Sequence, residues 1–190
     1  MKNIKVFTRE YIMKLNQLLN AVDENIVADI VDKFEQVAKT KNTIYIIGNG
    51  GSAATASHWT NDFSAGLKRR GILSIDIKSL ADNVPVCTAI ANDIGYENIF
   101  KLQLQDILTK DDIVFAISCS GTSPNIINAV KYAREVGATI IGATGFDGGE
   151  LMKLSDIKFH VQTPAGEYGL VEDVHMILDH IIYSYYMQKV

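Results

Sequence analysis

The residues His58 and Asp62 are the first in this sequence whose types and spacing could do acid–base or metal chemistry. They stand four apart, in SHWTND, and a spacing of four puts both side chains on one face of a helix. An imidazole and a carboxylate can move protons together or share a cation. By itself such a pair is more often solvent-facing, so its interpretation depends on the surrounding elements.

A glycine-rich turn lies just ahead of this pair. Gly48-Asn49-Gly50-Gly51-Ser52 follows the apolar run TIYII, which reads as a buried strand, and precedes a segment of helical character. Glycines allow close approach of a ligand, and the serine can cap a helix whose N-terminus favours an anion. The turn has neither the Gly-Lys-Ser/Thr of a Walker loop nor the third glycine of a dinucleotide fingerprint. A tight turn with a serine cap and an anion-binding loop are both consistent with it.

A second loop, Ser118-Cys119-Ser120-Gly121-Thr122-Ser123-Pro124, decides between these readings. It follows the apolar run DIVFAIS and carries four hydroxyls, whereas a helix cap needs only one. Proline is harmless in the first turn of a helix. Such a loop favours the binding of a group with several anionic oxygens, because the hydroxyls, the backbone N–H groups and the helix dipole all attract them. The loop contains no lysine or arginine, so it predicts a phosphate monoester held by neutral donors.

The elements that must position these loops alternate along the chain. Helical spacing over residues 5–37 predicts one or two amphipathic helices, whose apolar face needs cover from this domain or another subunit. Strands are predicted at 43–47, 72–77, 112–118, 138–143 and 157–161, and helices at 52–68, 84–92, 99–108, 124–136, 150–154 and 172–188. Such alternation predicts an α/β protein with a parallel sheet covered on both faces.

Composition excludes several classes of protein. The 190 residues are 47% hydrophobic and 21% charged, which is ordinary for one globular domain. A net charge of −4 argues against nucleic acid as a partner. No apolar run is long enough to span a membrane and no signal peptide is indicated, so we expect no membrane association. The cysteines, Cys87 and Cys119, match no metal motif and fit a reducing cytoplasm.

Several stretches together resemble sugar isomerase (SIS) domains and, more narrowly, the phosphoheptose isomerase family. They are GNGGSAATASHWTNDF, SLADNVPVCTAIANDIGYENIF, SCSGTSPNIINAV, TGFDGG and VEDVHMILDH, and they cover residues from about 46 to 180. The resemblance implies a three-layer α/β/α sandwich with a flavodoxin-like, five-stranded parallel sheet. It also implies a homotetramer with sites at subunit interfaces. Residues 1–190 would form a single SIS domain, with 1–40 a helical oligomerisation segment and 41–190 the α/β core.

The resemblance assigns roles to residues that match the family's motifs. Contacts to the phosphate and sugar fall on Asn49, Gly50, Gly51, Ser52, Asn92, Asp93, Ser118, Cys119, Ser120 and Ser123. The family uses a carboxylate of the first helix and a histidine of the last as catalytic groups, and it commonly binds zinc. The positions implied for one zinc ion per subunit are His58, Asp62, Glu172 and His180, and the predicted catalytic residues are Asp62, His180 and Glu172.

Three of these positions depart from the family's pattern. Cys119 replaces a usual threonine, Asp62 replaces a glutamate, and Glu172 replaces a glutamine. The shorter Asp62 retracts its oxygens by about one C–C bond, roughly 1.5 Å, which matters for a positioned base. On the last helix, His175 is expected to pack or to support the site, and His160 has no evident role.

The predicted function is isomerisation of sedoheptulose 7-phosphate to D-glycero-D-manno-heptose 7-phosphate through an enediol, for surface-glycan heptose in the cytoplasm. Such a reaction needs a base, a group that exchanges protons on the oxygens, and a stabiliser of the oxyanion. Two alternatives stay open. The departures at Asp62 and Glu172 suit an isomerase of a different phosphosugar, and some related SIS proteins are non-catalytic regulators that bind protein partners.

Overall fold

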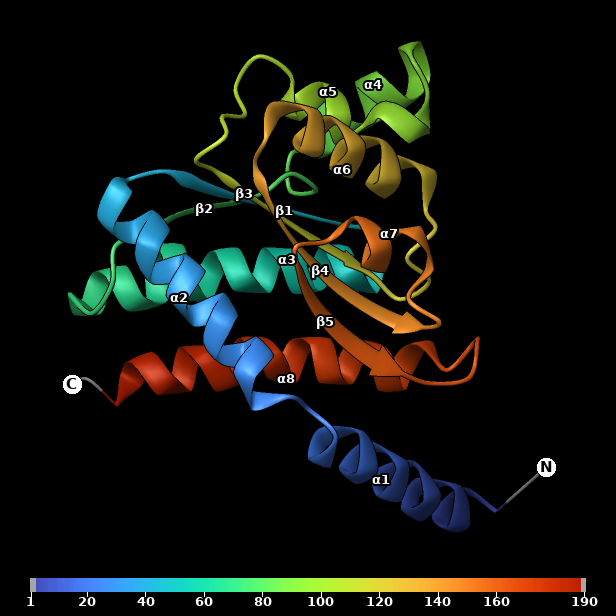
Figure 1. Ribbon diagram of the computed structural model, residues 1–190. Coiled ribbons are helices and arrows are strands. Elements are labelled where there is room, and N and C mark those ends of the chain that lie inside the picture. Colours follow the sequence, from blue (N-terminus) through green and yellow to red (C-terminus); the bar gives the residue numbers. More distant parts are fainter. Residues whose placement is uncertain (1–2, 189–190) are drawn as a thin grey trace.

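A sheet of five parallel strands, in the order β2-β1-β3-β4-β5, forms the centre of the computed structural model, which describes residues 3–188 (Figure 1). The strands are β1 Thr43–Gly48, β2 Asp76–Ser79, β3 Ile113–Ser118, β4 Thr139–Phe146 and β5 Ile157–Gln162. Residues 1, 2, 189 and 190 of the predicted domain lie outside the described residues. The strand order reverses between β1 and β3, and in such sheets ligands bind where the carboxyl ends of those strands diverge.

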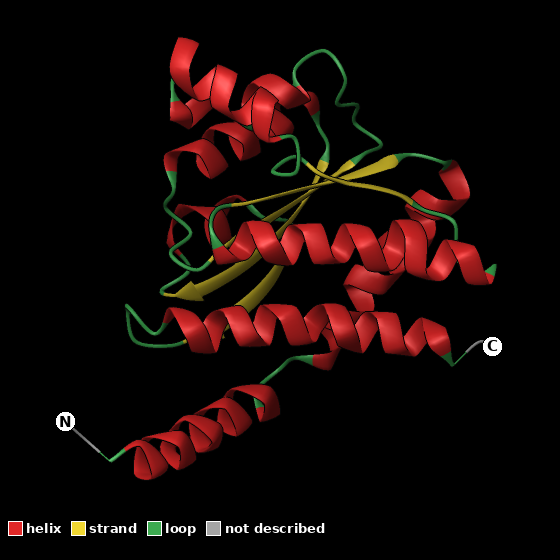
Figure 2. Ribbon diagram, turned by 180° about the vertical axis from the view of Figure 1, so that it is seen from behind, coloured by secondary structure: helices red, strands yellow, loops and turns green. Residues whose placement is uncertain are grey.

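Helices cover both faces of the sheet, which confirms the predicted three-layer α/β/α sandwich (Figures 1 and 2). One face is covered by α2, α3 and α8, and the other by α4 to α7. The helices are α1 Ile4–Asn20, α2 Glu24–Thr40, α3 Gly51–Thr60, α4 Val84–Asp93, α5 Lys101–Leu104, α6 Pro124–Val136, α7 Gly149–Leu154 and α8 Tyr168–Met187.

Two apolar cores, one on each face, hold the layers together. Alternate residues of β1 enter opposite cores: Ile44 and Ile46 pack toward α2, α3 and α8, whereas Tyr45 and Ile47 pack toward α4 to α7. A strand buried on both faces must be apolar throughout, which explains the continuous run TIYII. In the first core an aromatic cluster of Phe34, Trp59, Phe63 and Phe115 fixes α3 against α2 and β3. This packing sets the position of the His58–Asp62 face.

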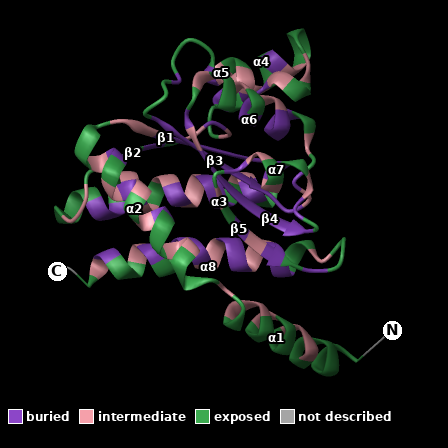
Figure 3. Ribbon diagram, in the orientation of Figure 1, coloured by how far each residue is buried: buried purple, intermediate pink, exposed green. Residues whose placement is uncertain are grey.

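The N-terminal helix α1 lies apart from the main body, beyond α8 (Figure 1). It contains no buried residue, and its apolar side chains Ile4, Phe7, Ile12 and Met13 are exposed (Figure 3). Its second half packs Leu15, Leu18 and Leu19 against the first core, and the Tyr11 hydroxyl donates a 2.7 Å hydrogen bond to Asp173 Oδ2 near the start of α8. The helical character of residues 1–40 is confirmed where they are described, and their role in oligomerisation stays a prediction. None of the described helices has the length and apolarity needed to cross a bilayer.

The predicted helix 52–68 changes character partway. After Thr60 it continues as a π-helix, Asn61–Leu67, and ends in a 3-10 turn, Lys68–Arg70. Short π segments are frequent at functional sites because they re-aim side chains, and this one contains Asp62. The predicted helix 99–108 is cut to Lys101–Leu104, since Asp106 adopts a φ of 64°.

Candidate functional site

A cavity of about 150 Å³ lies at the carboxyl ends of β1 and β3, where the strand order predicts a ligand site. Hydroxyls from both predicted loops line it, together with one carboxylate from α8. The lining residues are Asn49, Ser52, Ile117, Ser118, Cys119, Ser120, Ser123, Tyr168 and Glu172. The two loops singled out from the sequence are therefore brought together around one space, which we call the serine cavity.

The loop of residues 118–124, which we call the serine loop, is shaped by its backbone. Gly121 has a φ of 62°, and a Cβ there would lie 2.8 Å from the carbonyl carbon of Gly148, so only glycine fits. The Gly121 carbonyl accepts a 2.9 Å hydrogen bond from Leu151 N–H, which ties the loop to α7. Ser123 stands at the N-cap of α6, yet its side chain makes no capping hydrogen bond. Its hydroxyl, at the positive end of α6, therefore stays available to an anion in the cavity.

The side chain of Asn49 is engaged with protein partners. Asn49 and Asn125 exchange two amide hydrogen bonds of 2.8 and 2.9 Å, and the Tyr96 hydroxyl donates to Asn49 Oδ1 at 2.9 Å. Asn49 thus fixes the glycine-rich turn to α6. Gly50, at the N-cap of α3, has a φ of 53° and open space around it.

Glu172 lies against the first turn of α3. A Cβ on Gly51 would lie 2.5 Å from Glu172 Cδ, so the Glu172 carboxylate fits here only because Gly51 has no side chain. Burial, with a contribution from the charge of Glu172, raises the pKa of the Cys119 thiol to about 11. Cys119 therefore lines the cavity as a neutral thiol at physiological pH, and it does not react as a thiolate.

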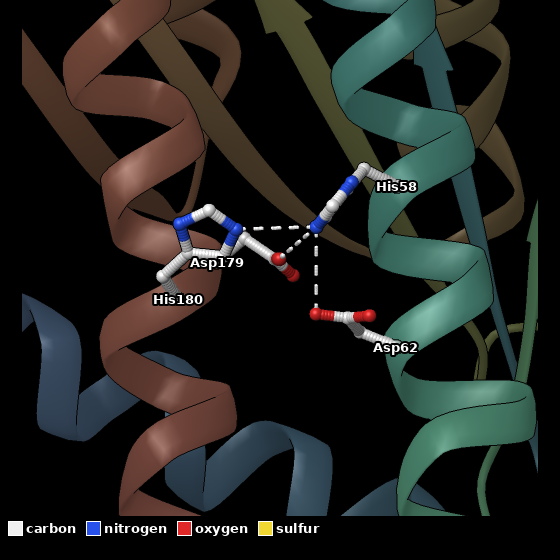
Figure 4. A group of neighbouring side chains, drawn as sticks. All are labelled: His58, Asp62, Asp179 and His180. Atoms are coloured by element: carbon white, nitrogen blue, oxygen red, sulfur yellow. Dashed lines mark hydrogen bonds and ion pairs between the residues drawn. The ribbon is translucent and has the colours of Figure 1, made fainter.

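A second group of polar side chains lies farther along the same two helices. His58 and Asp62, from α3 and the π-helix, face Asp179 and His180 of α8 (Figure 4). The Nε2 atoms of His58 and His180 are 3.1 Å apart, and His58 Nε2 lies 3.5 Å from Asp62 Oδ2 and 3.6 Å from Asp179 Oδ2. One potential ligand atom from each residue lies within 4.8 Å of all the others. We call these four residues the His/Asp cluster.

Asp179 is the unusual member of the His/Asp cluster. It is fully buried, and neither carboxylate oxygen has a hydrogen-bond partner. Burial, followed by the nearby charge of Asp62, raises the pKa of Asp179 to about 8. An unpartnered buried carboxylate is costly unless a proton or a cation compensates it.

The His/Asp cluster fits a divalent metal such as zinc. Two ligand atoms bound to one tetrahedral zinc, each at 2.0–2.1 Å, lie about 3.3 Å apart. The distances of 3.1, 3.5 and 3.6 Å around His58 Nε2 are close to that separation. Imidazole and carboxylate are also donors that zinc accepts.

The structure divides the predicted site residues. His58, Asp62 and His180 come together as predicted, but Glu172 lies outside the His/Asp cluster and lines the serine cavity. Asn92 and Asp93 are exposed at the end of α4 and do not line that cavity in this chain. The sequence reasoning missed Asp179, although one signal was available. Asp179 stands three and four residues from the buried Ile182 and His175, on the apolar face of α8 where a charge is out of place.

Comparisons with known proteins agree with this fold. The SIS domain family model matches residues 10–145. A phosphoheptose isomerase of Aliarcobacter butzleri is 38% identical over 149 residues, 77% of this chain and 76% of the relative. One of Sulfurimonas denitrificans is 34% identical over 188 residues, 94% and 93% of the two chains. The solved phosphoheptose isomerase of Neisseria gonorrhoeae matches with a TM-score of 0.84 at 25% identity, over 97% of each chain.

Proposed function

The chain belongs to the SIS domain family and, within it, to the phosphoheptose isomerases, and from this we propose that it interconverts sedoheptulose 7-phosphate and D-glycero-D-manno-heptose 7-phosphate. One observation carries the proposal. The serine cavity and the His/Asp cluster lie on the same pair of helices, α3 and α8. Together they supply an anion site and an acid–base site for one substrate.

The spacing of the two sites suits a seven-carbon sugar phosphate. Ser52 precedes His58 by six residues on α3, and Glu172 precedes Asp179 by seven on α8. At 1.5 Å per residue, the His/Asp cluster lies about 10 Å along the helices from the cavity. The open chain of the substrate has about eight bonds from phosphorus to C1, which span roughly 9–10 Å when extended. The phosphate in the serine loop would then bring C1 and C2 to the cluster.

Acid–base roles follow from that placement. Asp62 removes the proton from the carbon next to the carbonyl, the electrons of that C–H bond form the enediol, and Asp62 returns the proton to the neighbouring carbon. His180 exchanges the proton on the oxygens. Glu172, which lines the serine cavity, accepts hydrogen bonds from the sugar hydroxyls. Ser118, Ser120 and Ser123 hold the phosphate through neutral donors.

A divalent metal, with zinc as the predicted ion, would be held by His58 and His180 with a carboxylate of the His/Asp cluster. When bound, it supplies Lewis-acid polarisation of the carbonyl oxygen. The fit of the donor atoms and the unpartnered Asp179 support it. The homotetramer, the single domain over 1–190, the role in surface-glycan heptose and the cytoplasmic location stay predictions.

The test is incubation of the purified protein with sedoheptulose 7-phosphate, with and without added zinc, and with product resolved by chromatography. Turnover supports the proposal. Activity only on another ketose phosphate would instead favour an isomerase of a different sugar, for which the short Asp62 is the motivating feature. Inertness toward all sugar phosphates, with tight binding of a protein partner, would favour the regulator.

A further inference from the structure

We propose that Asn125 and Tyr96 are positioning residues that hold the side-chain amide of Asn49 with its nitrogen toward the serine cavity, where one N–H binds a phosphoryl oxygen of the substrate. This inference rests on the proposed function, because it adds a donor, and the two residues that orient it, to the anion site of that reaction. It concerns binding of the phosphate and involves no group of the His/Asp cluster.

The serine cavity has to bind an anion without the help of a cation. Among the described residues that line it there is no lysine, arginine or histidine, and one of them, Glu172, is a carboxylate. A phosphate there depends on neutral donors such as hydroxyls and amide N–H groups. Asn49 also lines the cavity, and its amide could present either a donor or an acceptor to it. Only the nitrogen end favours a phosphate, so the orientation of this amide decides whether Asn49 helps or hinders binding.

A backbone N–H determines the orientation of the amide pair. The Ile126 N–H can only donate, and at 3.0 Å it identifies the atom that it meets on Asn125 as Oδ1. Asn49 Nδ2 donates to this oxygen at 2.9 Å, and Asn125 Nδ2 donates in return to Asn49 Oδ1 at 2.8 Å. Exchanging nitrogen and oxygen on Asn49 would put the two oxygens against each other, and likewise the two nitrogens. Asn125 is 1% exposed, so solvent cannot replace the lost partners.

The hydroxyl of Tyr96 stabilises the same orientation from the other side. Tyr96 begins the 3-10 turn Tyr96–Asn98, and although it is 56% exposed, its hydroxyl donates to Asn49 Oδ1 at 2.9 Å. Both acceptor positions of that oxygen are then filled. Within the described part of the chain, Asn49 Nδ2 donates only to Asn125, so its second N–H points away from the amide pair and stays available.

The position of the amide pair indicates which end of the substrate this N–H meets. Asn125 belongs to the first turn of α6, and Ser123 is the N-cap of the same helix. Asn49 and Ser123 both line the serine cavity. The amide therefore lies at the end of the cavity where the α6 dipole and the Ser123 hydroxyl favour an anion. The acceptor expected there is the phosphoryl group.

The experiment measures phosphate binding and turnover separately. Inorganic phosphate and sedoheptulose 7-phosphate are each titrated into the purified protein by calorimetry, and kcat and KM are measured for the sugar phosphate. The variants are Tyr96→Phe, Asn125→Ala, Asn49→Ala and the double variant of Tyr96→Phe with Asn49→Ala. The matched control is Asn128→Ala, because Asn128 Nδ2 donates to the Glu97 carbonyl and so ties the same 3-10 turn to α6 without contacting Asn49.

We expect Tyr96→Phe to weaken phosphate binding about 3- to 10-fold, the factor that one neutral hydrogen bond is worth. KM should rise by a similar factor while kcat changes less than about twofold, because the lost contact is made equally before and during the reaction. Asn125→Ala should weaken binding at least as much, and Asn128→Ala should stay within about twofold of the parent. Thermal unfolding checks the fold of each variant, and Tyr96→Phe, at an exposed ring, keeps the test valid if Asn125→Ala does not fold.

The double variant shows whether Tyr96 acts through Asn49. In the Asn49→Ala background there is no amide to orient, so Tyr96→Phe should change phosphate binding by less than about twofold. The inference is overturned by an equal effect in both backgrounds, by parent-like binding in Tyr96→Phe, by an equal loss in Asn128→Ala, or by an effect on kcat alone. Weaker phosphate binding in Tyr96→Phe, in a protein that turns over no sugar phosphate, would refute the proposed function and keep the positioning roles.

Discussion

Replacing Gly51 with alanine gives a direct test of how Glu172 is positioned. The new Cβ would lie 2.5 Å from Glu172 Cδ, whereas ordinary contact begins at 3.4 Å, so the carboxylate must retreat by about 1 Å. A misplacement of 1 Å at a site that orients substrate costs on the order of 10²-fold in rate. We therefore expect kcat/KM for sedoheptulose 7-phosphate to fall between about 10- and 100-fold.

The same change should leave the fold intact. Gly51 is the first residue of α3 and does not adopt a positive φ. The group that must move is the end of a flexible side chain. Replacing glycine by alanine where the backbone allows it stabilises by about 0.4–1 kcal/mol. We expect the unfolding temperature of Gly51→Ala to equal or slightly exceed that of the parent, so lost activity would not reflect unfolding.

A double-mutant cycle supplies the control. In a Glu172→Ala background there is no carboxylate to displace, so adding Gly51→Ala should change kcat/KM by less than about twofold. Steady-state kinetics on the four proteins gives the coupling. The reasoning fails if Gly51→Ala lowers activity by the same factor in both backgrounds, or if it leaves the activity of the parent unchanged.

Three further predictions concern the loop and the core. Gly121→Ala should lower the free energy of unfolding by about 1–3 kcal/mol more than Gly137→Ala does. Both glycines have a positive φ, but only a Cβ at position 121 would meet backbone atoms, those of Gly148. Denaturant midpoints and the KM for substrate check this prediction. Trp59→Ala should cost about 3–5 kcal/mol in urea unfolding, since the indole is fully buried among aromatic rings. Burial lowers the pKa of His175 to about 4, so the folded state binds fewer protons than the unfolded state below pH 6.5. Stability should then fall by roughly 3 kcal/mol between about pH 6.5 and pH 4, and His175→Phe should flatten that profile.

Much of the fold could be predicted because the hydrophobic pattern of each segment agrees with its place in a sheet covered on both faces. The run TIYII had to be a strand buried on both faces, and the loop at 118–124 had to follow such a strand. Boundaries were harder to predict at the edge of the sheet. Ile72 to Ile75 looked like strand, but pairing begins only at Asp76, because Asp76 lies opposite Thr43, the first residue of β1, and α2 ends just before it at Thr40. Hydrophobic runs specify burial more firmly than they specify hydrogen-bonded pairing.

The candidate site was predictable only as far as helix periodicity reaches. A spacing of four placed His58 and Asp62 on one face correctly, and the same logic placed Glu172 and His180 on one face of α8. Periodicity gives the direction in which a side chain points from its own helix. It does not tell which residues of a neighbouring helix lie at the same level. Glu172 is level with Gly51, and His180 is level with His58, so these two α8 residues lie about 12 Å apart along the helix and belong to different groups of side chains.

Asp179 shows why the remaining part needed the packed structure. In sequence it adjoins His180 and would point about 100° away from it on an isolated helix, since 3.6 residues make a turn. The two adjacent side chains nevertheless meet at one point, because α3 lies close enough for His58 to reach between them (Figure 4). Convergence of this kind depends on the distance between two helices, and here Phe63, in the π-helix after α3, packs against Tyr183 and Tyr186 of α8. A charge placed on the apolar face of α8 could be noticed from the sequence, but its partner could be identified only from the packing of α8 on α3.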